Sequence, residues 1–448
     1  MAEIRPFHAL RYDPLRVPLQ NVVTQPYDKI TPAMQDKYYS LSPYNLVRVI
    51  LGKPEASDQD GNNVYTRAAK AFAEWQQSKI LVADSTPSIY AYFQRFTVPG
   101  DDPSKVFERL SFIAVGKIYE YSDGIIFRHE HTLAKPKADR LNLLRATKAH
   151  FGQIFMLYSD PAGSINRLLF DDPNYPQLEV TDEYGVLHRL RRISDPALLN
   201  MVCTAMADRK LIIADGHHRY ETALNYRNEV RTSDPALAEP SRFVMMTFVN
   251  MDEPGLVILP THRLIFGLKG LDKASLTKKL DDWCERSERS DIAERDPKAI
   301  LNTLSRSGEQ GAAFVAITKH GNYLLRPKRA KCDDLLKALS PRQQKLDVIQ
   351  LHHLVLEAAL GISEEQVRQQ TNIRYLRDAA EAIDAVHNDP EVNAAFLINP
   401  VKIGQMRDVA FSGEVMPQKS TDFYPKLLSG LTIYSLQHEN HAGSTLKG

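Results

Sequence analysis

The stretch that most constrains this chain is Leu211–Leu224, where a short apolar run meets a glycine and then helix-forming residues. The run Leu211–Ala214 is too short for a helix and favours a strand, while Gly216 supplies a turn and Glu221–Tyr226 favours a helix. A helix that begins near Gly216 leaves its first backbone N–H groups free and presents the positive end of its dipole. The sequence therefore predicts a strand, a turn and a helix whose start can bind an anion.

Four polar side chains surround this predicted turn. Asp215 precedes Gly216, and His217, His218 and Arg219 follow it, which adds two imidazoles and a guanidinium fork to the backbone donors. We interpret the cluster as a site that handles phosphate. A second interpretation stays open, in which Asp215 caps the helix and the histidines lie on its exposed face, because strand-Asp-Gly-helix junctions are common.

Length and composition place the chain among ordinary globular proteins. Its 448 residues suit two or three domains, with 43% hydrophobic and 25% charged residues. Lys and Arg number 56 against 55 Asp and Glu, so the net charge of +1 provides no overall field for nucleic acid or an anionic membrane. Any anion must therefore bind to a local cluster, and we expect a small-molecule substrate.

The cysteines and the apolar runs indicate a compartment. Cys203, Cys284 and Cys332 are widely spaced and form no CxxC pair, which favours a reducing compartment over a disulfide framework or a thiolate metal site. The first residues lack an apolar signal region, and no run approaches the roughly 20 apolar residues that span a bilayer. We therefore expect a cytoplasmic protein without membrane contact.

Periodicity predicts a mixed succession of helices and strands. The first part contains a helix, two strands joined by a loop, another strand, another helix and a hairpin that follows the central stretch (62–80, 88–97, 107–121, 152–158, 196–208 and 243–260). From Leu268 the sequence changes to charged helices, a hairpin over 312–327 and a strand over 396–400. We predict an α+β fold with a mixed sheet, a main region over 1–267 and an additional α/β region over 268–448.

Two further polar stretches carry candidate residues. His129-Glu130-His131 opens the strongest local basic bias in the chain, in which two acidic residues stand among six basic ones (Arg128, Lys135, Lys137, Arg140, Arg145 and Lys148). Near the C-terminus, Met416–Lys426 is a loop rich in hydroxyls and amines. Two interpretations stay open for its polar side chains, which either complete the site or simply pack (Lys419, Ser420 and Lys426).

The same residues suit two kinds of chemistry. A transition-metal site would use the imidazoles and Glu130, but the histidines lack the i,i+4 spacing of a helical HExxH motif, which disfavours it. Phosphoryl transfer needs cations, N–H donors, a hydrated Mg²⁺ and a base. Asp215 could hold Mg²⁺, Gly216–Arg219 could bind phosphate and Glu130 could be the base. There is no Walker A sequence and no kinase glycine-rich loop, and Glu130 could alternatively be a solvated loop carboxylate.

Four segments together resemble a large family of uncharacterised prokaryotic proteins over nearly the full chain (Val23–Asp28, His129–Leu141, Ile213–Tyr220 and Met416–Leu427). Within them, Asp215–Arg219 is similar to the signature of free-serine kinases of the ParB/sulfiredoxin superfamily. Those enzymes also carry a His-Glu pair before a basic helix, upstream of the signature, and use the Glu as the base on the serine hydroxyl.

The resemblance implies a ParB/sulfiredoxin-like catalytic core with an N-terminal extension over 1–267, and a nucleotide-dependent kinase that uses ATP or ADP with Mg²⁺ and acts on free L-serine. It implies that Glu130, with His129 beside it, is the base and that Asp215 holds the metal. It also implies phosphate binding by the turn and by basic residues of the predicted helix (Gly216, His217, His218, Arg219, Lys135, Lys137 and Arg140).

The chain departs from this pattern in two ways. Glu130 and Asp215 lie further apart in the sequence than their counterparts in the compact kinases, which an insertion around 173–192 would explain. The attacking cysteine of sulfiredoxin has no counterpart, since the nearest thiol, Cys203, lies upstream, so peroxiredoxin repair is disfavoured.

Two rival functions stay open. The first is a nucleotide-binding partition or regulatory module of the ParB type, which the net charge of +1 and the lack of an evident DNA-recognition helix disfavour. The second is a metal-dependent hydrolase, which bound zinc or iron would indicate.

Overall fold

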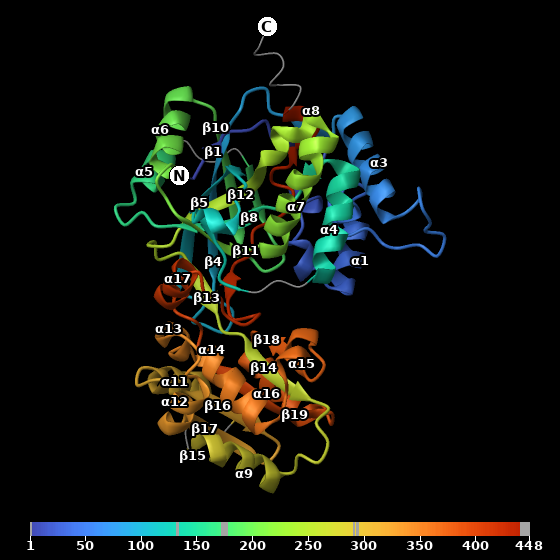
Figure 1. Ribbon diagram of the computed structural model, residues 1–448. Coiled ribbons are helices and arrows are strands. Elements are labelled where there is room, and N and C mark those ends of the chain that lie inside the picture. Colours follow the sequence, from blue (N-terminus) through green and yellow to red (C-terminus); the bar gives the residue numbers. More distant parts are fainter. Residues whose placement is uncertain (1, 131–133, 172–177, 290–291, 293–294, 440–448) are drawn as a thin grey trace.

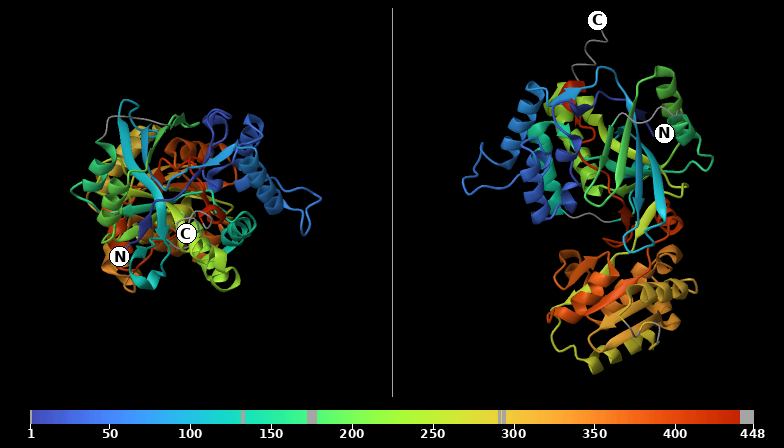
Figure 2. Two further views of the ribbon diagram at one scale, coloured as in Figure 1. Left: turned by 90° about the horizontal axis from the view of Figure 1, so that it is seen from above. Right: turned by 180° about the vertical axis from the view of Figure 1, so that it is seen from behind.

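The computed structural model describes residues 2–130, 134–171, 178–289, 292 and 295–439, which form two stacked lobes (Figures 1 and 2). The first lobe is built on a nine-stranded sheet and the second on a six-stranded sheet. Among the described residues, no helix is both long enough and apolar enough to cross a membrane.

The sheet of the first lobe is mixed, as predicted. Its order is β6-β11-β8-β12-β5-β4-β10-β9, with β1 beside β5. The β6–β11 and β8–β12 pairs are parallel and the others are antiparallel. The strands are β1 (Ile4–Arg5), β4 (Ile89–Thr97), β5 (Val106–Lys117), β6 (Ile126–Phe127), β8 (Ile154–Tyr158), β9 (Leu178–Thr181), β10 (Leu187–Ile193), β11 (Leu211–Asp215) and β12 (Phe243–Asn250).

Helices cover both faces of this sheet (Figure 1). One face carries α5 (Ser164–Phe170) and α6 (Pro196–Met206), and α3, α4 and α7 lie on the other side (Val64–Gln77, Ala134–Thr147 and His217–Ser233). The helix predicted over 62–80 is confirmed as α3, because Asn63 caps it and Phe72 and Trp75 are buried one turn apart. Near it lie α1 (Pro32–Leu41), α2 (Val47–Ile50) and a small ladder of β2 with β3 (Leu10–Tyr12 and Leu81–Ala83).

The second lobe is an antiparallel sheet in the order β15-β17-β16-β19-β14-β18. Its strands are β14 (His262–Phe266), β15 (Cys284–Ser287), β16 (Phe314–Thr318), β17 (Gly321–Pro327), β18 (Ile373–Leu376) and β19 (Val392–Ile398). The hairpin predicted over 312–327 is confirmed as β16–β17. One core of this lobe joins α11 and α16 to the sheet, and the other joins α9, α14 and a π-helical segment (Pro297–Gly308, Ala379–Asn388, Lys273–Trp283, Asp347–Gln350 and Leu351–Ala359). The remaining helices are α12 (Arg329–Leu335), α13 (Pro341–Gln344), α15 (Glu364–Gln369) and α17 (Ile403–Phe411).

The hairpin predicted over 243–260 is wrong. β12 pairs with β5 and β8, and β13 (Val257–Leu259) pairs with β20 (Asp422–Tyr424) near the end of the chain. The reason is burial, because every residue of β12 is buried inside the large sheet and both of its edges are already occupied. The turn after β12 therefore carries the chain out of that sheet.

After α17 the chain leaves the second lobe and returns to the first; we call residues 412–436 the return segment. It forms β20 against β13 and β21 (Tyr434–Ser435) against β7 (Ala149–His150). Single bridges join Met416 to Glu130 and Ser429 to Thr24. A division of the chain at 267/268 stays a prediction, but β14 belongs to the second sheet and the return segment contacts the first lobe.

Two buried arginines hold the return segment by its backbone. Arg109, with 1% of its surface exposed, donates to the carbonyls of Tyr424 and Pro425 at 3.2 and 2.6 Å and to Gln94 Oε1 at 2.9 Å. Arg263, equally buried, donates to the carbonyl of Lys419 at 3.2 Å. Both ends of the stretch between Lys419 and Pro425 are therefore fixed by charge-assisted hydrogen bonds.

We predict that Arg109→Met destabilises the protein by about 3 kcal/mol, because it leaves buried carbonyl and amide acceptors without a donor. The urea midpoint of unfolding measures the effect. Arg95→Met, on exposed β4 surface with only a 3.9 Å ion pair to Glu108, is the matched control and should change stability by less than about 0.5 kcal/mol. Equal midpoints for the two variants would contradict the role given to Arg109.

Candidate functional site

The central stretch folds as the sequence predicts. β11 ends at Asp215, Gly216 lies at φ 93° and α7 begins at His217. Gly216 is required twice over: its φ is in the left-handed region, and a Cβ there would lie 3.0 Å from Nε of Arg219. No side chain in the described part of the chain caps α7. The positive end of this helix is therefore open to an anion.

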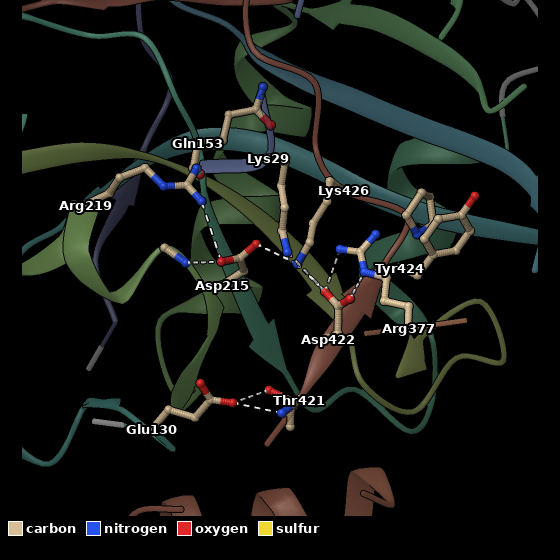
Figure 3. A network of polar contacts seen from close by, with 12 residues as sticks. Lys29, Glu130, Gln153, Asp215, Arg219, Arg377, Thr421, Asp422, Tyr424 and Lys426 are labelled. Carbon is tan, nitrogen blue, oxygen red and sulfur yellow. Dashed lines mark hydrogen bonds and ion pairs between the residues drawn. The ribbon is translucent and has the colours of Figure 1, made fainter. Parts of the chain in front are cut away.

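A cavity of about 360 Å³ lies beside the start of α7. Three parts of the chain line it. The first lobe contributes Asp28, Lys29, Glu130, Asp215 and His217; the return segment contributes Lys419, Thr421, Asp422 and Lys426; the second lobe contributes Arg374, Tyr375 and Arg377. Glu130 and Asp215, which are distant in sequence, thus face one cavity (Figure 3).

An alternating row of charges forms one wall of the cavity (Figure 3). The ammonium of Lys426 lies 3.0 Å from Asp215 Oδ2 and 2.9 Å from Asp422 Oδ1. Arg377 donates to Asp422 at 3.0 Å, and Lys29 lies 3.8 Å from the same carboxylate. Burial alone would raise the pKa of Asp422, but Lys426, Lys29 and Arg377 lower it to about 2. In the same way, Lys426 and Arg219 outweigh burial and hold the pKa of Asp215 well below its usual range.

Glu130 is held by the return segment. Its Oε1 accepts from the backbone N–H of Thr421 at 2.9 Å and from the Thr421 hydroxyl at 2.8 Å, and Oε2 accepts from the N–H of Lys419 at 3.3 Å. Burial favours the neutral acid, but His129, His217 and Thr421 lower the pKa of Glu130 to about 2. The carboxylate is therefore ionised at neutral pH, with 15% of the side chain exposed.

His217 offers an unused nitrogen at the start of α7. The residue is 9% exposed, and its Nε2 is buried without a hydrogen-bond partner among the described residues. Its ring lies 5.0 Å from the ring of His129. Burial, followed by the neighbouring His129, lowers the pKa of His217 to about 3, so its imidazole is neutral. A buried, unpaired nitrogen that lines a cavity is available to a water or to a ligand atom beside it.

Several residues of the predicted phosphate site lie outside this cavity. Arg219 donates to the carbonyl of Gln153 and lies 3.8 Å from Asp215, so it supports the turn from behind. With Arg140 it lines a separate cavity of about 60 Å³. Arg140 donates to Asp139 at 2.8 Å and stacks on Tyr27.

Four further residues of the predicted site either do not line the main cavity or have a side chain outside the described residues (Lys137, His218, Ser420 and Lys135). Lys137 is ion-paired with Glu221, and His218 is half-buried and does not line the main cavity. Ser420 is buried and donates to the carbonyl of Pro417 at 2.6 Å. The backbone of Lys135 lies in α4, but His131 and the side chain of Lys135 lie outside the described residues.

Seven polar or charged residues named above as lining the cavity were not predicted as site residues (Asp28, Lys29, Arg374, Tyr375, Arg377, Thr421 and Asp422). Thr421 and Asp422 lie within the hydroxyl-rich loop that the sequence singles out, and Lys29 directly follows one of the segments that carry the resemblance, so a local signal existed for these three. Arg374 and Arg377 of the second lobe had none, because their place depends on how the two lobes meet.

The donor set does not fit a metal held by the protein alone. Among the described residues there is no group of three or more His, Cys, Asp or Glu placed to bind a metal ion. One oxygen of Asp215 is paired with Lys426, whose ammonium lies where a cation would bind, and the other accepts from the N–H of Gly216 at 2.7 Å. Binding of Mg²⁺ at Asp215 therefore stays a prediction.

We predict that anion binding depends on the protonation of Lys29. Burial and then Lys426 lower the pKa of Lys29 to about 8, so its ammonium is lost as the pH rises through that value. Sulfate keeps its charge in this range, and its affinity, measured by calorimetry, should fall about fivefold between about pH 7 and pH 10. Lys29→Arg stays charged and should bind sulfate with little change. The same fall in Lys29→Arg would exclude Lys29 as its cause.

Comparisons with known proteins give a family and a weak structural likeness. No curated protein matches the chain. Solved structures that match weakly include a variant of a free serine kinase in complex with AMP (9% identity, TM-score 0.34, 70% of this chain and 90% of that chain). A conserved hypothetical protein from Pyrococcus furiosus (11%, TM-score 0.33, 70% and 94%) and C-terminally truncated SbnI from Staphylococcus aureus (11%, TM-score 0.32, 72% and 90%) are comparable. Residues 4–349 match the family described as "Protein of unknown function (DUF1015)", and the chain therefore belongs to that family.

Proposed function

We propose that the protein is a phosphotransferase with a ParB/sulfiredoxin-like core, which transfers a phosphoryl group from ATP or ADP to the hydroxyl of a small molecule, with free L-serine as the leading acceptor. One observation carries the proposal: the ionised carboxylate of Glu130 and the uncapped start of α7 face a single cavity of about 360 Å³. The similarity of Asp215–Arg219 to the free-serine kinase signature supports the choice of acceptor.

The charges around the cavity suit a bound phosphate. Five cationic side chains and four carboxylates line it, and Lys426 is engaged between two of the carboxylates. Lys29 lies 3.8 Å from Asp422, and the ammonium of Lys419 makes no ion pair within the described part of the chain. A phosphate at the start of α7 would supply the missing negative charge, with the unpaired Nε2 of His217 beside it.

Glu130 would orient the acceptor and take its proton. Because Oε1 already accepts from Thr421, the cavity-facing lone pairs of Oε2 are left for the acceptor hydroxyl. As the new O–P bond forms, the hydroxyl proton moves to Oε2, and the leaving oxygen of the nucleotide keeps the electrons of the broken P–O bond. A carboxylate with a pKa of about 2 is a weak base, which suits a loose transition state in which the proton moves late.

A free amino acid fits the mixture of charges. A zwitterion needs a cation for its carboxylate and a carboxylate for its ammonium, and the cavity offers both Arg377 and Asp28. A neutral polyol carries no charge that could pair with Asp28 or with the cations of the cavity. The mixed lining therefore favours an amino acid over an uncharged acceptor.

We predict that the protein, incubated with ATP or ADP, Mg²⁺ and a panel of amino acids and polyols, adds one phosphate to serine, detected by mass spectrometry. Glu130→Gln should lower the rate at least about 10²-fold, because the amide cannot accept the proton, while nucleotide binding is retained. Glu229→Gln, at an exposed ion pair with Arg145, is the matched control and should keep the native rate.

Full activity of Glu130→Gln would remove Glu130 from the reaction. Nucleotide binding without phosphorylation of any acceptor would contradict a kinase and favour a nucleotide-binding regulatory module. Zinc or iron in equal amount to protein purified without added metal would favour a hydrolase instead.

A further inference from the structure

The side chains of His129, Thr421 and Glu130 form a row. In this row Thr421 joins the buried histidine to the carboxylate. Nδ1 of His129 lies 2.8 Å from the carbonyl oxygen of Ile213, and its Nε2 lies 2.7 Å from Oγ1 of Thr421. The same Oγ1 lies 2.8 Å from Oε1 of Glu130, while the direct distance from Nε2 to Oε1 is 3.6 Å. His129 is 0% exposed, so water does not reach its ring. The Thr421 hydroxyl is therefore the bridge between imidazole and carboxylate.

Counting hydrogens shows that this row holds one proton more than its ordinary charge states provide. A carbonyl oxygen only accepts, so Nδ1 of His129 must carry a hydrogen. The two contacts of the Thr421 hydroxyl then need two hydrogens, and the hydroxyl has one. With a neutral His129 and an ionised Glu130, one contact would place two lone pairs face to face at less than 3 Å. The second hydrogen must come from His129 or from Glu130.

We propose that His129 is an imidazolium at neutral pH and that Thr421 couples it to an ionised Glu130, so that the three residues work as one unit that keeps the proposed base in its carboxylate form. Nε2–H of His129 donates to Oγ1, and the Thr421 hydroxyl donates to Oε1. The alternative arrangement is reached when the Nε2 proton moves to Oγ1 as the Oγ1 proton moves to Oε1. His129 is then neutral and Glu130 protonated, and no charge enters or leaves the unit.

The groups around the unit favour the first arrangement. Glu130 also accepts backbone N–H groups from Thr421 and Lys419, and such bonds stabilise a carboxylate. The guanidinium of Arg263, on β14, acts on Glu130 with a favourable charge. The other ionisable neighbours are Tyr375 on β18, which is neutral below its raised pKa, and His217 on α7, whose lowered pKa keeps it neutral beside His129. The ring of Phe423 packs edge-on against His129, with the ring centroids 6.1 Å apart.

In the proposed reaction His129 and Thr421 are positioning residues, since both act through Glu130, which takes the acceptor's proton; this part of the inference rests on the proposed function. If the hydroxyl is lost, His129 gives up its proton and the neighbouring charge that stabilises the carboxylate disappears. The pKa of Glu130 then rises towards that of an ordinary buried acid. The proton on Nε2 of His129 can be observed directly, whether or not the protein has phosphotransferase activity.

The test is a ¹⁵N NMR titration of the full-length protein between about pH 5 and pH 9, with the His129 signals assigned by their loss in His129→Asn. The native protein and Thr421→Ser should show both ring nitrogens of His129 protonated around pH 7. Thr421→Val should show one. Thr24→Val removes a buried hydroxyl that has no partner among the described residues, and it should leave the His129 signals unchanged.

The pH dependence of kcat is the second measurement. In Thr421→Val the acid limb of kcat should move up by at least about one pH unit, with Thr421→Ser close to native. A native His129 with one unprotonated nitrogen around pH 7 would overturn the inference even if the enzyme phosphorylates serine. A doubly protonated His129 in a protein without phosphotransferase activity would support the coupled unit and contradict the proposed function alone. The native spectrum decides the point even if Thr421→Val does not fold.

Discussion

The site depends on one buried ammonium. Lys426, 9% exposed, forms ion pairs with Asp215 at the end of β11 and with Asp422 in β20. Asp422 in turn accepts a hydrogen bond from Arg377 of the second lobe. Buried charges are tolerated only when each is paired, and loss of one partner leaves the others uncompensated. The row of charges therefore ties the turn, the return segment and the second lobe into one wall, and the cavity has its shape because that wall is closed.

The return segment is held in place along its whole contact with the site. Met416 donates from its backbone to His129, and buried Arg263 and Arg109 bind the carbonyls further along. Lys419 has a φ of 59°, a left-handed conformation that costs a residue with a side chain about 1 kcal/mol or more. In this conformation its N–H points to Glu130. The strained backbone at Lys419 thus allows the return segment to direct an additional N–H donor to the carboxylate.

The sequence pattern correctly predicted the elements that depend on neighbouring residues alone. The short apolar run and Gly216 were enough for the strand, turn and helix, and the regular burial of Phe72 and Trp75 was enough for α3. The hairpin over 243–260 failed because a continuous apolar run identifies a strand but not its partner, and β12 pairs with strands that are far away in sequence. The meeting of Glu130 with Thr421 has the same origin, since it depends on the return of the chain from the second lobe.

Arg219 belongs to the Asp215–Arg219 motif, but its side chain does not have the role in phosphate binding that the sequence predicts. It lies in the first turn of α7, where a helical side chain leans back towards the N-terminus, and there it covers Gly216 and donates to Gln153. Its guanidinium therefore stabilises the turn and does not line the main cavity. The positive charge that faces the cavity comes from other segments, namely Lys29, two lysines of the return segment and two arginines of the second lobe (Lys419, Lys426, Arg374 and Arg377). An anion held at the start of α7 would thus meet backbone donors from the motif and charged side chains from elsewhere, so the residues that recognise the ligand need not be those that shape the turn.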